Sequence, residues 1–118
     1  MDAHLGIVET TEGNALVAAV KYSLTRAIIE DGKLGQDILN MEGMSGKKYR
    51  IFINNLIENI ADPRYLEIGV WLGSTLCSAI YDNNVKALAI DNWSEFDGAE
   101  TFFANISRFK GPNPAFPG

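Results

Sequence analysis

Two acidic residues and two glycines in the second half of the chain have the types and spacing of a small-molecule site. Glu67 lies inside the apolar run YLEIGVWLGSTL, which is interrupted by Gly69 and Gly73. A packed core gains nothing from such a carboxylate, because burying an unpaired charge is costly. Asp91 directly follows a second apolar run, VKALAI. A carboxylate, a glycine turn and a second carboxylate in this order indicate a bound polar ligand.

Short strands and helices must position these residues. Residues 65–70 and 85–90 are typical of buried strands, and the mostly apolar second one predicts cover on both faces. Residues 74–81 and 99–109 have helical patterns. The order strand, helix, strand, helix is that of a doubly wound α/β sheet, in which ligands bind beyond the carboxyl ends of the strands.

Helical patterns also precede the first strand. Residues 33–40 favour a short helix, and Ser45 is expected to cap a longer one. Two apolar stripes recur at helical spacing, and Asp62-Pro63 ends the second. The stripes are formed by Leu16, Val20, Leu24, Ala27 and Ile28, and by Tyr49, Phe52, Ile53, Leu56, Ile57 and Ile60.

Composition argues against several classes of protein. The 118 residues suit one domain or part of one, and the net charge of -5 disfavours nucleic acid or anionic membranes as partners. No apolar run approaches the roughly 20 residues that span a bilayer. The acidic N-terminus does not resemble a signal peptide, so we expect a cytoplasmic protein. With one cysteine, Cys77, and one histidine, His4, we expect no metal site of these residues and no internal disulfide.

The glycine spacing bears on the kind of ligand. A dinucleotide fingerprint needs a third glycine, which is missing after Gly73, and Glu67 would repel a pyrophosphate. A cationic ligand suits Glu67 better. S-adenosylmethionine carries a sulfonium, an ammonium, a carboxylate and a ribose. These groups match Glu67, the N-terminus of a helix starting near Ser74, and Asp91 as a partner of the ribose hydroxyls.

At these residues the chain resembles a known family. YLEIGVWLGSTL resembles the first motif of class I S-adenosylmethionine-dependent methyltransferases, in its E-x-G-x-x-x-G-[ST] form, and ALAIDNWSEF resembles the second motif. MSGKKYRIFINNL is similar to the helix that leads into the sheet in small bacterial and phage members. The resemblance covers about residues 43–109. It implies a Rossmann-like domain at 45–118, truncated after its second strand–helix unit, with a helical extension at 1–44.

The resemblance also implies which residues bind the cofactor. They lie along the two motifs: Glu67, Gly69, Gly73, Ser74, Thr75, Asp91, Asn92 and Trp93. The first three would shape the methionine pocket, and the hydroxyl pair would meet the ligand carboxylate or cap the helix. Asp91 would hold the ribose, and the last two residues would lie against the adenine. The implied reaction is methyl transfer to a small-molecule acceptor, with neither the acceptor, a catalytic base nor a metal site indicated.

Each residue also has a purely structural alternative. Glu67 pairs with a Lys or Arg in one alternative, the glycines serve only a tight turn, and Asp91 is a turn residue. Trp93 and Phe96 pack under the sheet edge as readily as they stack on adenine. The acidic residues of the same loop fit a solvated surface better than a metal site; they are Glu95, Asp97 and Glu100.

Other functional classes stay open. The chain is either part of an enzyme or a binding module that keeps a nucleoside site or a protein interface without catalysis. A nucleotide-dependent dehydrogenase is disfavoured by the absent third glycine. Two strands cannot cover their own faces and edges. Either the helices close over the sheet within the monomer, or two chains share these surfaces. We favour the second and expect a homo-oligomer that turns over no methyl acceptor unaided.

Overall fold

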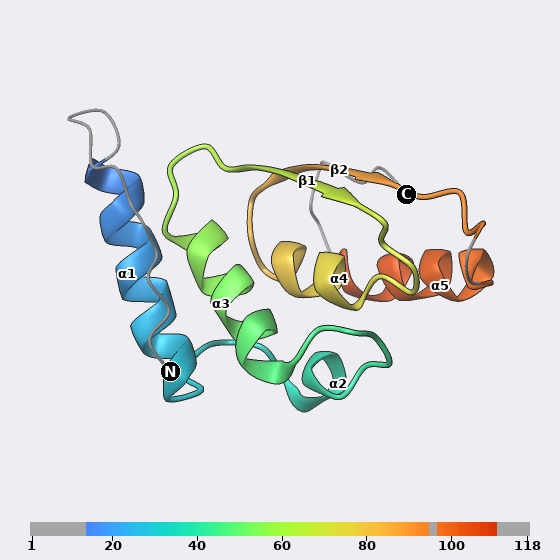
Figure 1. Cartoon of the computed structure of the whole chain (residues 1–118), viewed down its shortest axis with the longest axis horizontal. Helices are drawn as coiled ribbons and strands as arrows, with labels where there is room; N and C mark the ends of the chain where they lie inside the picture. The colour runs from blue at the N-terminus through green and yellow to red at the C-terminus, as the bar shows by residue number, and fades with distance from the viewer. Residues whose placement is uncertain (1–13, 95–96, 111–118) are drawn as a thin grey trace.

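The computed structural model of the protein describes residues 14–94 and 97–110. This part is a small mixed α/β domain with a two-stranded parallel sheet (Figure 1). Its elements in chain order are α1 (Asn14–Ile28), α2 (Gln36–Leu39), α3 (Lys47–Glu58), β1 (Arg64–Ile68), α4 (Ser74–Ile80), β2 (Lys86–Ile90) and α5 (Ala99–Phe109). None of the helices in the described part combines the length and apolarity that crossing a bilayer requires.

The two strands pair in parallel through the crossover helix α4. The register runs without a slip from Arg64 opposite Lys86 to Ile68 opposite Ile90. The Gly69 N–H donates to the Ile90 carbonyl at 2.7 Å and so extends the ladder by one bond. The carboxyl ends of both strands therefore meet at one edge, as the strand–helix–strand pattern predicts.

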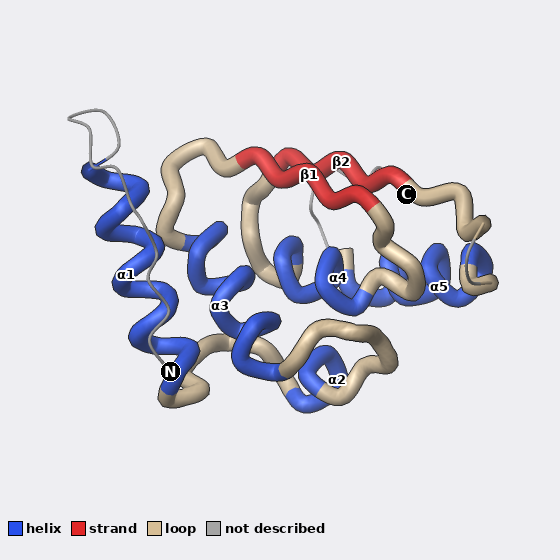
Figure 2. Tube along the Cα trace, in the orientation of Figure 1, coloured by secondary structure: helices blue, strands red, loops and turns tan. Residues whose placement is uncertain are grey.

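Helices α2 to α5 lie on one side of the sheet, and α1 stands beyond α3 (Figure 2). α1 packs against α3, α3 against α4, and α4 against α5. Fully buried apolar side chains fill the space between these layers, among them Ile38, Leu76 and Ile80. Ala27 and Leu34 join the same cluster, so the segment before residue 45 shares one core with the segment after it.

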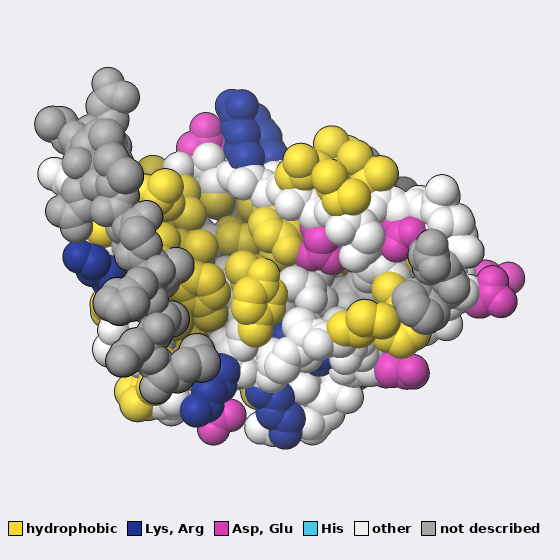
Figure 3. Space-filling model, in the orientation of Figure 1, with side chains coloured by type: hydrophobic (Ala, Val, Ile, Leu, Met, Phe, Trp, Pro, Cys, Tyr) yellow, Lys and Arg dark blue, Asp and Glu magenta, His cyan; other side chains and the backbone are white. Residues whose placement is uncertain are grey.

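The opposite face of the sheet is open, and the expectation of cover on both faces was wrong. Leu66 and Leu88 are 58% and 60% exposed, and Ile68 and Ile90 are 74% and 49% exposed. Hydrophobic side chains accordingly gather over the strands in the space-filling view (Figure 3). An apolar strand sequence indicates only that burial of its side chains is favourable. The described helices bury one face of the sheet and leave the other exposed.

The expected elements are otherwise confirmed, with small shifts. The helix at 99–109 has the expected bounds, and β1 ends at Ile68 rather than residue 70, because Gly69 turns the chain with a φ of 79°. Ser45 does not cap a helix. α3 begins at Lys47, and Gly46 stands at its cap position without a side-chain bond. The Ser45 oxygen instead accepts hydrogen bonds from Arg50 and Thr75.

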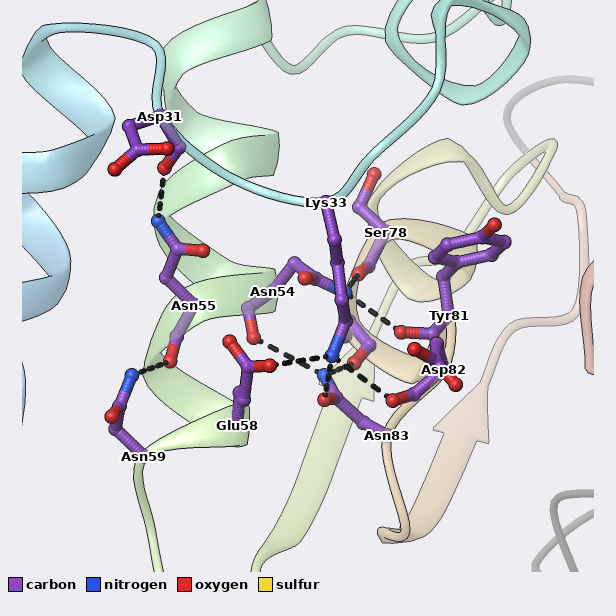
Figure 4. A network of polar contacts seen from close by, with 11 residues as sticks. Asp31, Lys33, Asn54, Asn55, Glu58, Asn59, Ser78, Tyr81, Asp82 and Asn83 are labelled. Carbon is purple, nitrogen blue, oxygen red and sulfur yellow. Dashed lines mark hydrogen bonds and ion pairs between the residues drawn. The ribbon is translucent and has the colours of Figure 1, made fainter.

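A polar network joins α3 to the end of α4 (Figure 4). The buried Asn54 amide donates to the Ser78 and Tyr81 carbonyls at 2.8 and 2.9 Å. Asn83 donates back to the Asn54 carbonyl at 3.1 Å, and Lys33 donates to the Asn83 side-chain oxygen at 2.7 Å. These bonds fix the chain just before the start of β2.

Candidate functional site

The carboxylate of Asp91 joins the glycine turn to the end of β2. Its Oδ2 accepts the Trp71 N–H at 2.9 Å, and its Oδ1 accepts the Trp93 N–H at 2.8 Å. These bonds, that from Trp71 first, hold the pKa of Asp91 below its usual value. The structure thus brings the predicted turn and the predicted acid into direct contact.

Asp91 also holds two unusual backbone conformations. Trp71 and Trp93 have φ angles of 45° and 53°, a region that residues with a Cβ rarely adopt. The backbone N–H groups of Asn92 and Val70 lower the pKa of Asp91 further. The group is therefore ionised and fixed in place.

The two predicted glycines have different surroundings. Both have positive φ, 79° at Gly69 and 87° at Gly73. A Cβ built on Gly73 would lie 3.0 Å from the Phe102 ring, whereas one on Gly69 meets nothing within 4 Å. Gly73 therefore allows α5 to pack closely, and Gly69 leaves open space beside the end of β2.

Glu67 faces the helix side of the sheet. The Tyr65 hydroxyl donates to its Oε1, and no ion pair among the described residues includes Glu67. Burial raises the pKa of Glu67, and the bond from Tyr65 opposes that rise only in part. The alternative of a salt bridge to Lys or Arg is thus not realised with any described residue. The contact of Glu67 with a cationic ligand stays a prediction.

Ser74 and Thr75 contact a loop from earlier in the chain. Thr75 Oγ1 donates to Ser45 Oγ at 2.8 Å. A Cβ on Gly43 would overlap the Ser74 hydroxyl and lie 2.6 Å from its Cβ, so the loop at residues 42–46 lies directly on the start of α4. The hydroxyl pair predicted to meet a ligand carboxylate is therefore engaged within the protein.

Arg50 anchors this loop, and sequence reasoning missed it. Only 2% of the residue is exposed. Its Nε donates to Ser45 Oγ at 2.9 Å, and its Nη1 donates to the carbonyls of Ile38 and Met41, both at 2.8 Å, and of Leu39 at 3.3 Å. The signal in the sequence was an arginine three and seven residues before Ile53 and Ile57, which places a cation beside the apolar stripe of the longer helix.

Asn92 and Trp93 follow Asp91 but differ in role. Asn92 is exposed, and its Oδ1 accepts the Ser94 N–H at 3.0 Å. The Trp93 indole donates to the Trp71 carbonyl at 2.8 Å, and its ring centre lies 5.4 Å from that of Phe102. Trp93 therefore packs on α5, as its structural alternative expects. Phe96 and Glu95 lie outside the described residues.

A pocket of about 550 Å³ lies beside this edge, between the glycine turn and the start of α5. Trp71, Asp97 and Glu100 line it, together with Glu42 from the loop over α4. The Trp71 indole donates to the Asp97 carbonyl at 3.0 Å and closes one wall. Within residues 14–94 and 97–110, no three His, Cys, Asp or Glu residues are grouped in a way that would hold a metal ion.

Comparison of the chain with protein-family models, curated proteins and solved structures finds no match. The geometry of the site is therefore the basis for a functional assignment.

Proposed function

We propose that this α/β domain is the cofactor-binding part of a Rossmann-like, class I S-adenosylmethionine-dependent methyltransferase. One observation carries the proposal. The glycine turn after β1 is bonded through Trp71 to the carboxylate that ends β2, at the edge where parallel strands expose their carboxyl ends. A carboxylate fixed there suits a ribose diol, whose hydroxyl groups can donate to it.

The residues present fit the nucleoside end of the cofactor. Asp91 accepts the two ribose hydroxyls, the open space at Gly69 admits the sugar without a Cβ in the way, and the exposed Asn92 amide faces solvent beside them. S-adenosylmethionine supplies an electrophilic methyl group for a small-molecule acceptor. We assign the ribose as the part of the cofactor that the site binds first. Ser74 and Thr75, which were predicted to meet the carboxylate of the cofactor, already contact the loop at residues 42–46.

Calorimetry tests the ligand class. S-adenosylmethionine, S-adenosylhomocysteine, adenosine and NAD are titrated separately into the protein. The proposal expects S-adenosylhomocysteine to bind more tightly than NAD, because the turn lacks the third glycine that a pyrophosphate needs. Tighter binding of NAD, or equal binding of all four, would contradict it.

A matched pair of variants tests the role of Asp91. Asp91→Asn removes the charge that accepts the ribose hydroxyls and should weaken binding of S-adenosylhomocysteine roughly tenfold or more. Asp62→Asn removes the same charge from the exposed turn before β1, at the other end of the sheet, and should leave affinity unchanged. Circular dichroism of both variants monitors the fold, because Asp91 also holds the backbone of Trp71 and Trp93. Equal affinities in a folded Asp91→Asn protein would mean that Asp91 is structural.

Gly69→Ala tests the open space beside that carboxylate. The added methyl group meets no protein atom within 4 Å, and only the positive φ strains the variant, by about 1 kcal/mol. If the space belongs to the ligand, affinity should fall while the fold persists. Unchanged affinity would place the nucleoside elsewhere.

A binding module without catalysis is the second candidate. It is favoured by Glu67 and Thr75, whose side chains hydrogen-bond to Tyr65 and Ser45, and by Ser74, which packs closely against Gly43. The two candidates differ in turnover. Release of S-adenosylhomocysteine above background with a panel of small hydroxyl and amine acceptors would establish the enzyme, and cofactor binding without release would favour the module.

A further inference from the structure

The open face of the sheet has an ordered layout. Because the strands are in register, its outward residues form three facing pairs from the amino to the carboxyl end: Arg64 and Lys86, Leu66 and Leu88, Ile68 and Ile90. Two cations therefore stand at one end of a strip of four large apolar side chains, between half and three quarters exposed. Monomers rarely leave such a contiguous apolar patch uncovered.

A shallow depression marks the basic half of this face. It has a volume of about 340 Å³ and is lined by both strands around Arg64, Leu66, Lys86 and Leu88. Among the described residues, neither Arg64 nor Lys86 takes part in an ion pair. The face therefore suits an apolar partner that carries negative charge at one end.

The dimensions of the sheet select a helix as that partner. Strands of five residues are roughly 17 Å long, and two strands lie about 5 Å apart. One helix of about 10 Å diameter covers this width, and about 11 helical residues cover the length. A second, equally narrow sheet would match the apolar pairs but would bring no defined charge to the two cations.

α1 offers a matching surface. Its buried contacts with α3 use the face of Ala19, Ser23 and Ala27. Beside that face, Leu16, Leu24 and Ile28 remain 53%, 39% and 58% exposed, and the half-buried Val20 completes an i, i+4, i+8, i+12 stripe. α1 has 15 residues, enough to run the length of the strip.

The charge at the end of α1 also matches. Its carboxyl terminus carries the negative end of the helix dipole, and the exposed Glu30 and Asp31 follow it. Asp31 is paired with Arg26 at 2.9 Å, which leaves Glu30 to face an external cation. Laid with this end over Arg64 and Lys86, the stripe of α1 would cover the leucine and isoleucine pairs.

We propose that the open sheet face binds α1 of a second copy of the chain. Each copy presents both surfaces, and in the proposed dimer a two-fold axis makes the contact twice, whereas a contact that did not close would extend into a filament. In its own chain α1 is packed on α3, outside the helix layer of the sheet, so the partner helix comes from another molecule (Figure 1).

Size exclusion with light scattering at micromolar concentration tests the proposal. The wild-type chain should be a dimer, and Leu88→Lys on the sheet or Ile28→Lys on α1 should each weaken association at least tenfold. Ile29→Gln is the matched control, because Ile29 is 71% exposed and lies off the stripe, and glutamine adds no charge beside Arg64 and Lys86. Met44→Lys, at a 74% exposed residue away from the sheet, is a second control. Both controls should stay dimeric.

Mixing the two defective variants gives a sharper result. A mixed dimer of Leu88→Lys and Ile28→Lys regains one intact contact, between the unchanged α1 of the first and the unchanged sheet of the second. We expect mixed dimers to form where neither variant dimerises alone. All four variants change exposed residues, and thermal melts verify that they fold.

Three outcomes would overturn the proposal. A wild-type monomer at micromolar concentration shows that nothing in a second copy covers the face. A dimer that Leu88→Lys breaks and Ile28→Lys leaves intact shows sheet-on-sheet contact. A dimer that neither substitution affects uses another surface.

Discussion

The two faces of the sheet are opposite in character, although the same two strands form both. Tyr65, Glu67, Ala87 and Ala89 point to the helices and are half-buried. Leu66, Ile68, Leu88 and Ile90 point away from them and are exposed. The larger apolar side chains thus lie on the uncovered face, and the small or polar ones lie on the covered face. The helices build the core largely among themselves, and the alanines let them approach the sheet.

This difference has an energetic meaning. Full burial of a Leu or Ile side chain stabilises a protein by about 1.5–3 kcal/mol, so the open face holds several kcal/mol that the described part of the chain does not realise. The helix side depends instead on polar groups that the fold must satisfy. Substitutions on the helix side should therefore lower the free energy of unfolding strongly. Substitutions on the open face should lower it little, unless a partner covers that face.

The largest effect is expected from Arg50→Met. The substitution removes the N–H groups that donate to three backbone carbonyls and to the Ser45 hydroxyl, and it leaves no large cavity. Each buried polar group left unpaired costs about 1–3 kcal/mol, so the free energy of unfolding should fall by about 3 kcal/mol or more. Urea unfolding measures this loss.

Leu88→Ser is the control on the open face. Measured at a concentration where the chain is monomeric, it should change the free energy of unfolding by less than about 1 kcal/mol. Comparable losses in Arg50→Met and Leu88→Ser would mean that the two sides do not differ as described.

An intermediate effect is expected from Gly43→Ala. The new methyl group overlaps the Ser74 side chain and must push the loop at residues 42–46 off α4, at a cost of about 1–3 kcal/mol. Gly46→Ala lies three residues away and meets nothing within 4 Å, so its thermal midpoint should hardly change. Adding Ser74→Gly to Gly43→Ala should restore part of the loss, and a failure to do so would place the strain elsewhere.

The smallest effect concerns Glu67 and depends on pH. Burial raises its pKa in the folded protein above the unfolded value, so ionisation opposes folding. Its contribution to stability is complete below the unfolded pKa and is lost as the pH rises through the folded pKa. Glu67→Gln keeps an acceptor for the Tyr65 hydroxyl and removes the charge.

Melting curves across pH measure that contribution. Glu67→Gln should melt a few degrees above the wild-type chain at neutral pH, and the difference should vanish in acid. A variant less stable than the wild type at neutral pH would mean that the carboxylate is stabilised by a partner in the fold.

The sequence allowed the order of the elements to be predicted, because apolar spacing and turn residues are local signals. The bounds of α4 and α5 follow from such signals. The open face was not predictable in the same way. An apolar strand shows that its residues prefer to be covered, and the position of the covering helices is decided by packing between distant segments.

The same distinction between local signals and packing of distant segments applies to the candidate site. The proximity of Gly69 and Asp91 was predictable, because parallel strands end at one edge. The orientation of Glu67 depends on strand register, and the engagement of Thr75 depends on Ser45, which is 30 residues earlier in the chain. Arg50 was missed because a buried arginine that binds only carbonyls and a hydroxyl has no charge partner to identify it.

The bond between the Trp93 indole and the Trp71 carbonyl places both tryptophans of the chain at the candidate site. Indole emission responds strongly to solvent and to stacked aromatic rings. The tryptophan fluorescence of this protein therefore originates at the edge where the strands end. An adenine ring that arrives there would change the emission directly, so the two indoles would report binding of the proposed cofactor.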